Sequence, residues 1–213
     1  MSGESGAPAR TEARRVLVLR HGQTDHNAND IWQGQLDSDL SDTGREQART
    51  AAAALAAYRP SRVVASDLRR AAETGVEVAA ACGIPISYDP RWREIHVGEW
   101  AGMTSAQVRE QYPEEQDRLL RGEDFRRGGH GESVADVADR VQAALGDLLA
   151  ELGPGECAVI ATHGVTGRAV AAELVGIEQA LAWRVLGGLG NCHWAELVEG
   201  QRGWRIHTWN AFT

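Results

Sequence analysis

Short runs of apolar residues alternate along this chain with longer segments in which apolar residues recur at helical spacing. The short runs have the length of buried strands and lie at residues 16–20, 62–65, 86–88 and 158–162. The longer segments predict amphipathic helices at residues 41–58, 66–82, 104–111, 113–121, 133–152 and 165–175. Near the carboxyl end, two further apolar runs flank Glu199-Gly200 and predict an antiparallel hairpin, at residues 193–198 and 204–209. Because strands alternate with helices, we expect an α/β fold with three α/β/α layers around a central, mostly parallel mixed sheet.

Capping residues mark the ends of the first two helices. Ser41 is the expected N-cap of the first helix, and Ser66 or Asp67 is the expected N-cap of the second. Gly83 follows the second helix and is expected to end it.

The remaining segments are less regular. Residues 22–40 predict a loop, and we interpret residues 89–132 as an excursion over the ligand-binding end of the sheet, not as a separate domain. Residues 1–13 are small and polar, which predicts a disordered N-terminal tail and leaves residues 14–213 as a single domain.

The charge balance excludes several kinds of protein. The 213 residues carry a formal net charge of −8, which argues against nucleic-acid binding but permits an anionic small substrate in a local arginine pocket. The chain contains no lysine, which removes the phosphate-binding P-loop and Schiff-base chemistry. Metal-ligand spacing is also absent, so we expect no metal and no cofactor, and a chemistry that uses His, Arg, Asp and Glu.

The sequence also predicts a cellular location. It has no apolar run long enough to span a membrane and no secretory signal, so we expect no membrane association. Its cysteines, Cys82, Cys157 and Cys192, are scattered and odd in number, which is typical of a reducing cytoplasm.

Two apolar strands end in His-Gly. His21 follows the strand at residues 16–20, with Arg20 beside it, and His163 follows the strand at residues 158–162. Ligands of open α/β sheets bind beyond the carboxyl ends of the strands, so the two imidazoles can meet in one pocket. A histidine beside an arginine suits phosphoryl transfer, because one side chain attacks while the other holds the anion. The alternative interpretation is an ordinary loop at a strand end.

Two further segments carry candidate chemistry. Residues 66–74 begin a helix after another strand, and an arginine in its first turn could bind a phosphate, although helical arginines are usually solvated. Residues 91–102 place carboxylates among aromatic residues, where Glu94 could act as an acid or could simply be a salt-bridged loop carboxylate.

Together, these four segments resemble the histidine phosphatase superfamily, in the branch that includes cofactor-dependent phosphoglycerate mutases and small-molecule phosphatases. The likeness covers residues 16–213, and its most specific parts are RHGQTDHN, QGQLDSDLSDTGREQA and SDLRRAAET. Further segments, among them REIHVGEW, GLGNCHW and the ending WNA, resemble the glucosyl-3-phosphoglycerate phosphatases of that superfamily. The resemblance implies a phosphoglycerate mutase-like fold and a metal-independent phosphomonoesterase that acts through phosphohistidine on a small phosphorylated metabolite, glucosyl-3-phosphoglycerate.

The resemblance also implies catalytic roles. His21 would be the nucleophile, Arg20 and Arg70 would bind the phosphoryl oxygens, and His163 would complete the pocket. Glu94 would protonate the leaving alkoxide and then help to activate water. The superfamily's helical arginine is the fourth residue after the serine, which is Arg70 and not its neighbour Arg69. Other positions that match phosphate- or substrate-binding residues are Asn27, Gln33, Gly34 and Asn191.

Several alternatives stay open. A phosphoglycerate mutase would need a bisphosphate to prime His21, a broad sugar-phosphate phosphatase would use the same catalytic set, and a scaffold protein would not turn over at all. Residues 110–131 depart from the glucosyl-3-phosphoglycerate phosphatases and lie where the substrate would be selected. This segment contains four arginines: Arg118, Arg121, Arg126 and Arg127. One of them could bind a substrate carboxylate, or they form a solvated face paired with Glu114, Glu115, Glu123 and Asp124. The hairpin could also pair a homodimer through its edge strand.

Overall fold

A computed structural model describes residues 13–213, and the expected disordered tail lies, except for Ala13, outside the described residues. A six-stranded sheet has the order β3-β2-β4-β1-β5-β6. Its strands are β1 (Arg15–Arg20), β2 (Arg62–Ala65), β3 (Ile86–Tyr88), β4 (Cys157–Thr162), β5 (Trp194–Gly200) and β6 (Gly203–Ala211). The first four strands are parallel, whereas β5 and β6 are antiparallel, so the prediction of a mostly parallel mixed sheet is confirmed.

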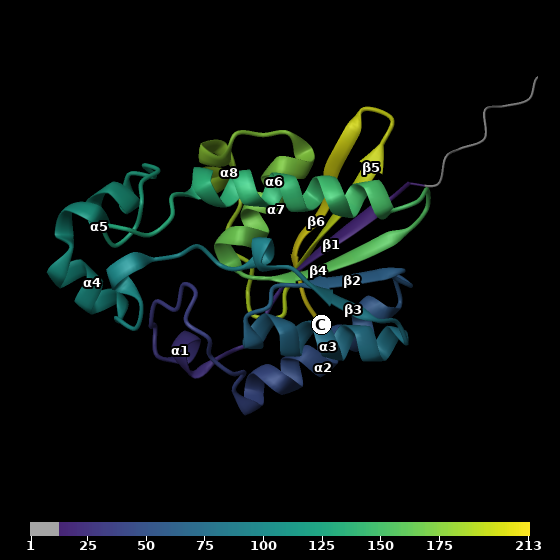
Figure 1. The fold of residues 1–213 in the computed structure, drawn as a ribbon, viewed down its shortest axis with the longest axis horizontal. Helices are drawn as coiled ribbons and strands as arrows, with labels where there is room; N and C mark the ends of the chain where they lie inside the picture. The colour runs from purple at the N-terminus through teal and green to yellow at the C-terminus, as the bar shows by residue number, and fades with distance from the viewer. Residues whose placement is uncertain (1–12) are drawn as a thin grey trace, which may run out of the picture.

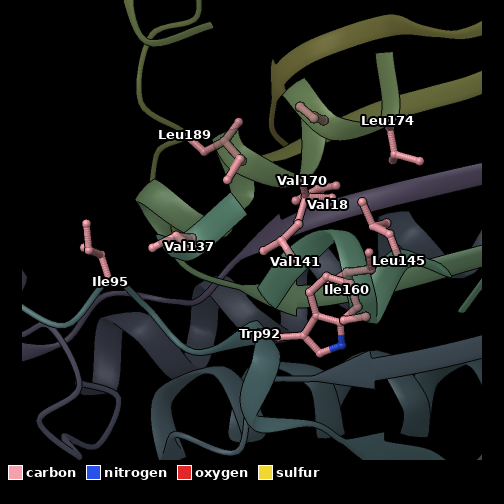
Figure 2. Packing of buried hydrophobic residues seen from close by; sticks show 14 of the residues in the cluster. Val18, Trp92, Ile95, Val137, Val141, Leu145, Ile160, Val170, Leu174 and Leu189 are labelled. Atoms are coloured by element: carbon pink, nitrogen blue, oxygen red, sulfur yellow. The ribbon is translucent and has the colours of Figure 1, made fainter. Parts of the chain in front are cut away.

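Helices cover both faces of the sheet, which confirms the three layers. Helices α2 (Asp42–Ala56) and α3 (Arg69–Cys82) lie on one face, and α6 (Val134–Glu151) and α7 (Gly164–Val175) lie on the other (Figure 1). The alternation of side chains along β1 explains why both faces are buried. Val16 and Val18 join the cluster under α6 and α7, part of which Figure 2 shows, whereas Leu17 and Leu19 join the cluster under α2 and α3.

The expected caps are confirmed except at the start of α3. The Ser41 side chain accepts a hydrogen bond from the Gly44 N–H at the start of α2, and Gly83 ends α3 in a left-handed conformation with φ of 67°. The prediction that Ser66 or Asp67 caps α3 is wrong. The N-cap of α3 is Leu68, which offers no side-chain acceptor, so the Ser66 hydroxyl is free for another partner.

Three other details differ from the sequence prediction. The expected loop at residues 22–40 contains α1 (Asp25–Ala28), and α8 (Gln179–Val185) was not expected. The irregular stretch of the excursion holds two 3₁₀ turns, η1 (Pro90–Trp92) and η2 (Gly98–Trp100). Helices α4 (Ser105–Gln111) and α5 (Pro113–Leu120) follow, and both lie beyond the carboxyl ends of the parallel strands, as does α1 (Figure 1). Among the described residues, no helix is long and apolar enough to cross a bilayer.

Candidate active site

The two histidines that follow β1 and β4 lie side by side. Arg20 pairs with Thr162 in the parallel register, so the next residue of each strand is the histidine. The rings of His21 and His163 have centroids 5.1 Å apart in an edge-on arrangement. Both side chains are buried, and only His21 reaches the wall of the cavity beyond the strands. His163 therefore lies behind the histidine that a ligand would meet.

One ring nitrogen of His21 is unprotonated. Its Nδ1 lies 2.7 Å from the Gly22 carbonyl oxygen, so Nδ1 carries the proton and Nε2 is unprotonated. Burial, followed by the charges of Arg70 and Arg20, holds the pKa of His21 well below its usual range. The imidazole is consequently neutral at physiological pH, and its Nε2 can attack an electrophile.

Arg70 contacts this nitrogen directly. Its side chain is 1% exposed, and its Nε donates to His21 Nε2 at 3.3 Å. Its two terminal nitrogens donate to the Leu36 and Gly34 carbonyls at 2.6 and 2.8 Å, which fixes the plane of the guanidinium. Burial lowers the pKa of Arg70 to about 10, so the group stays charged.

Arg69 lies outside this site. Its exposed side chain forms ion pairs with Asp37 and Asp39. One step along α3 thus separates a buried arginine at the histidine from an arginine in a surface network.

Arg20 supplies a second guanidinium beside His21. Its Nη1 donates to the Leu189 carbonyl at 2.6 Å, while Nε has no hydrogen-bond partner among residues 13–213. Burial lowers the pKa of Arg20 from its ordinary value. A buried donor without an acceptor is costly unless a ligand satisfies it, so the position favours an anion.

His163 is positioned by Ser66, one of the two residues expected to cap α3. The Ser66 hydroxyl lies 2.9 Å from His163 Nε2 and also accepts the Leu68 N–H at 3.3 Å. His163 Nδ1 has no partner among the described residues, and burial lowers the pKa of this ring as well. The serine of the motif at residues 66–74 was the available signal, because a hydroxyl beside a strand-end histidine is suited to orienting it.

Glu94 lies at the amino end of α7, the helix that begins directly after His163. Its Oε1 accepts from the N–H groups of Ile95 and Thr166, and its Oε2 accepts from the Val165 N–H. The structure places Glu94 in no ion pair with the described residues, so the interpretation as a salt-bridged loop carboxylate is wrong. A Cβ added at Gly164 would lie 3.6 Å from Glu94 Oε2 and 3.9 Å from Arg20 Nε, which shows that both groups flank the same point.

The remaining candidates form one hydrogen-bonded wall. Asn191 Nδ2 donates to the His21 carbonyl at 3.1 Å and to Asn27 Oδ1 at 3.2 Å. Gln33 is nearly buried, and its Oε1 accepts from the hydroxyl of Thr24. Gly34 contributes the carbonyl that holds Arg70, and its φ of 51° favours glycine.

A cavity of about 440 Å³ opens in front of His21. Its walls include Arg20, Asn27, Gln33, Gly34, Arg70, Glu94, Arg127 and Asn191. An antiparallel bridge between Ile31 and Thr104 joins the loop after β1 to the excursion, so both segments enclose the same space. In residues 13–213, no group of three or more His, Cys, Asp or Glu side chains is placed to hold a metal ion.

The four arginines of residues 110–131 do not behave alike. Arg118 and Arg121 pair with Glu123, and Arg126 pairs with Asp136, all at the surface. For these three, the interpretation as a solvated face is confirmed. For Arg127 it is wrong, because this side chain is 2% exposed and lies in the cavity wall.

Comparison with known proteins places this site in a family. A family model described as the histidine phosphatase superfamily (branch 1) matches residues 16–211. A glucosyl-3-phosphoglycerate phosphatase of Mycolicibacterium vanbaalenii is 42% identical over 93% of this chain and 95% of its own length. A probable phosphoglycerate mutase of an Enterobacter species is 32% identical over 92% of this chain and 89% of its own length.

A solved structure gives the same result. A mycobacterial glucosyl-3-phosphoglycerate phosphatase in complex with VO3 superposes with a TM-score of 0.85 at 40% identity, over 93% of this chain and 99% of that one. The chain is a phosphatase that belongs to branch 1 of the histidine phosphatase superfamily.

Proposed function

We propose that this chain hydrolyses a phosphate monoester through a phosphohistidine on His21, without a metal ion. The observation that carries the proposal is the neutral His21 ring, whose unprotonated Nε2 contacts the buried Arg70 guanidinium in the cavity that Arg20 also lines. A phosphate monoester carries roughly −1.5 to −2 charges at neutral pH, which Arg20 and Arg70 can match. Phosphoryl transfer depends mostly on positioning and on charge stabilisation, which fixed donors provide.

In the first step, His21 Nε2 attacks phosphorus, the P–N bond forms and the ester P–O bond breaks. Glu94 gives its proton to the leaving alkoxide, which departs as an alcohol. Its Oε2 is the natural place for that proton, because Oε2 accepts one hydrogen bond whereas Oε1 accepts several. As the Nε2 lone pair forms the P–N bond it stops accepting from Arg70, and the Arg70 Nε–H becomes available to a phosphoryl oxygen.

In the second step, a water attacks the phosphohistidine. The Glu94 carboxylate takes a proton from the water, the P–N bond breaks, and its electron pair returns to His21 Nε2. His163 stabilises the transferring group from its position behind His21, and its Nδ1 has no partner among the described residues. Asn27, Gln33, Gly34 and Asn191 support the phosphoryl pocket or the substrate. Phosphate leaves, and the site returns to its starting state.

We propose glucosyl-3-phosphoglycerate as the substrate. The support is that relatives carrying this activity in their names are 40–42% identical over nearly the whole chain. The mutase alternative rests on relatives of lower identity, at about 30–32%.

The test is phosphate release by the purified protein in EDTA, with no bisphosphoglycerate added. The substrates are glucosyl-3-phosphoglycerate, 3-phosphoglycerate and simple sugar phosphates. We expect turnover of the glucosylated ester to exceed the others and an acid-labile phosphoryl group on His21 after rapid quenching. Equal or faster turnover of the other esters would refute the substrate, and no release from any ester would refute the phosphatase.

We also propose a cytoplasmic location, a homodimer and the absence of a nucleic-acid partner. The free thiols of Cys82, Cys157 and Cys192 support a cytoplasmic location. Strand β6 lies at the edge of the sheet, which supports a homodimer paired through it, and the mass in solution would test this. The net charge of −8 supports the absence of a nucleic-acid partner.

A further inference from the structure

Arg127 is a buried charge in the cavity wall that the catalytic steps above do not use. Its side chain is 2% exposed, and its Nη1 has no hydrogen-bond partner among residues 13–213. No described carboxylate forms an ion pair with it, in contrast to Arg118, Arg121 and Arg126. Burial lowers its pKa to about 10, so it remains a cation at neutral pH.

Aromatic rings hold this guanidinium in place. It lies 5.9 Å from the ring centroid of Trp32 and 5.3 Å from that of Trp183. Trp183 belongs to α8 and also meets Arg168, whose guanidinium lies 4.1 Å from the ring. Cation–π contacts orient a guanidinium without neutralising it, so the positive charge of Arg127 stays available.

The backbone of Arg127 is equally fixed. Its carbonyl accepts the Gly131 N–H at 2.9 Å, and its N–H donates to the Glu132 carbonyl. A Cβ on Gly98 would lie 2.6 Å from that carbonyl oxygen, so the chain segments pack too closely for any side chain there. The guanidinium therefore keeps its place at the cavity, and this built position is suited to a ligand.

The phosphoryl pocket already has its own cations. Arg20 and Arg70 contact the loops and the histidine beside β1, and the structure records no hydrogen bond between either of them and Arg127. All three line one cavity of about 440 Å³, which has room for more than a phosphate. Glu94 and Asp124 attract the buried Arg127 cation without forming an ion pair with it, and a second anion on the substrate would relieve the remaining cost of burial.

We propose that Arg127 binds the carboxylate of a phosphoglycerate-type ester and so sets the preference for substrates that carry both a phosphate and a carboxylate. The guanidinium fork matches the two oxygens of a carboxylate. Trp32 and Trp183 are the positioning residues of this subsite. The proposal rests on the proposed function, because it names the second group of the same substrate.

The test compares two esters on two variants. The esters are 3-phosphoglycerate and glycerol 3-phosphate, which differ in the carboxylate. The variants are Arg127→Met, which keeps the stem and removes the charge, and Arg126→Met, a matched control at the exposed neighbour that pairs with Asp136. The measured quantity is the ratio of kcat/KM for the carboxylate ester to kcat/KM for the other ester.

We expect the ratio to fall roughly 10- to 100-fold in Arg127→Met, which is the effect of losing a charged hydrogen bond. Arg126→Met should keep the wild-type ratio. A ratio in Arg127→Met within about threefold of wild type would overturn the proposal, as would an equal loss on both esters, which is the mark of a structural role. Arg127→Gln also removes the charge and is the second variant if Arg127→Met does not fold, with the same fall in the ratio expected.

A binding measurement separates this proposal from the catalytic one. If the wild-type protein releases no phosphate from any ester, the proposed function fails, but the subsite is still testable by calorimetric titration with 3-phosphoglycerate. Wild-type protein should then bind it roughly 10- to 100-fold more tightly than Arg127→Met does. Equal affinity of the two proteins would overturn the subsite alone.

Discussion

Arg69 and Arg70 offer a sharp test of the site, because they are adjacent in sequence and differ completely in surroundings. We expect Arg70→Ala to remove nearly all turnover and Arg69→Ala to have a mild effect. Arg70 is 1% exposed and bonds to His21 Nε2, whereas Arg69 is exposed and bonds to Asp37. Both substitutions delete the same atoms from the same helix, so the helix propensity changes equally.

The magnitude follows from the three bonds that Arg70 makes. Two of them satisfy the Leu36 and Gly34 carbonyls, and an unsatisfied buried acceptor costs about 1–3 kcal/mol. We therefore expect Arg70→Ala to lower the free energy of unfolding by about 2–6 kcal/mol. Loss of a donor that stabilises the transferring phosphoryl group removes roughly 10²- to 10³-fold in kcat. The exposed ion pairs of Arg69 are worth about 0–1 kcal/mol in stability.

The assay is steady-state phosphate release together with urea unfolding of both variants. Arg70→Lys serves as a control that keeps the charge and loses the fork. It should recover stability poorly, because one ammonium cannot reach both carbonyls in the same plane. The role of Arg70 is refuted if Arg69→Ala loses more turnover than Arg70→Ala does, or if folded Arg70→Ala stays within about tenfold of the wild-type kcat.

Three further predictions address the buried histidines and a glycine. Because burial holds the pKa of His21 and His163 below the ordinary value of 6.5, only the unfolded chain takes up their protons below that pH. The free energy of unfolding should then fall as the pH drops from 7.5 to 5.5, by up to about 1.4 kcal/mol per pH unit for each ring. Urea titrations of His21→Gln should show a shallower slope, and an unchanged slope would contradict the assignment. Ser66→Ala removes the bond to His163 Nε2 and should lower kcat by about tenfold with little change in KM, whereas a change confined to KM would argue against a positioning role. Gly34→Ala places a Cβ 2.6 Å from a valine methyl at a positive φ, so it should destabilise the fold by about 1–3 kcal/mol more than Gly83→Ala, which has a positive φ but open space. Equal decreases in the melting temperature of the two variants would show that the structure relaxes around the contact with the valine methyl at little cost.

The sequence predicted most of the fold because its strands and long helices bury strongly periodic faces. Strand β1 sends alternate residues into two cores, and that pattern is legible without a structure. Helix α8 was missed because its apolar Leu181 and Val185 are exposed and form no buried stripe. Short helices whose apolar residues face solvent have no periodicity to detect.

For the site, sequence motifs identified the residues better than the chemical character of single residues did. Arg70 was distinguishable from Arg69 by its spacing from the serine, whereas the role of Ser66 beside His163 depended on the fold. Arg127 could not be separated from three neighbouring arginines, since all four lie among acidic residues in the sequence. Only its burial distinguishes Arg127 from the other three. That burial depends on how the excursion packs on Trp32 and Trp183, which the sequence does not show.

The placement of β1 has a consequence for biosynthesis. This strand emerges from the ribosome first, yet its two neighbours in the sheet are β4 and β5, which begin at Cys157 and Trp194. Both edges of β1, which contains the apolar residues 16–19, therefore stay unpaired until most of the chain has been synthesised. An unpaired strand edge can form hydrogen bonds with another chain. Arginines flank this stretch on both sides, at positions 15 and 20, and charges in those positions hinder aggregation of a nascent chain. His21, which follows β1, can meet His163 only after β4 has been synthesised, so incomplete chains carry no assembled catalytic centre.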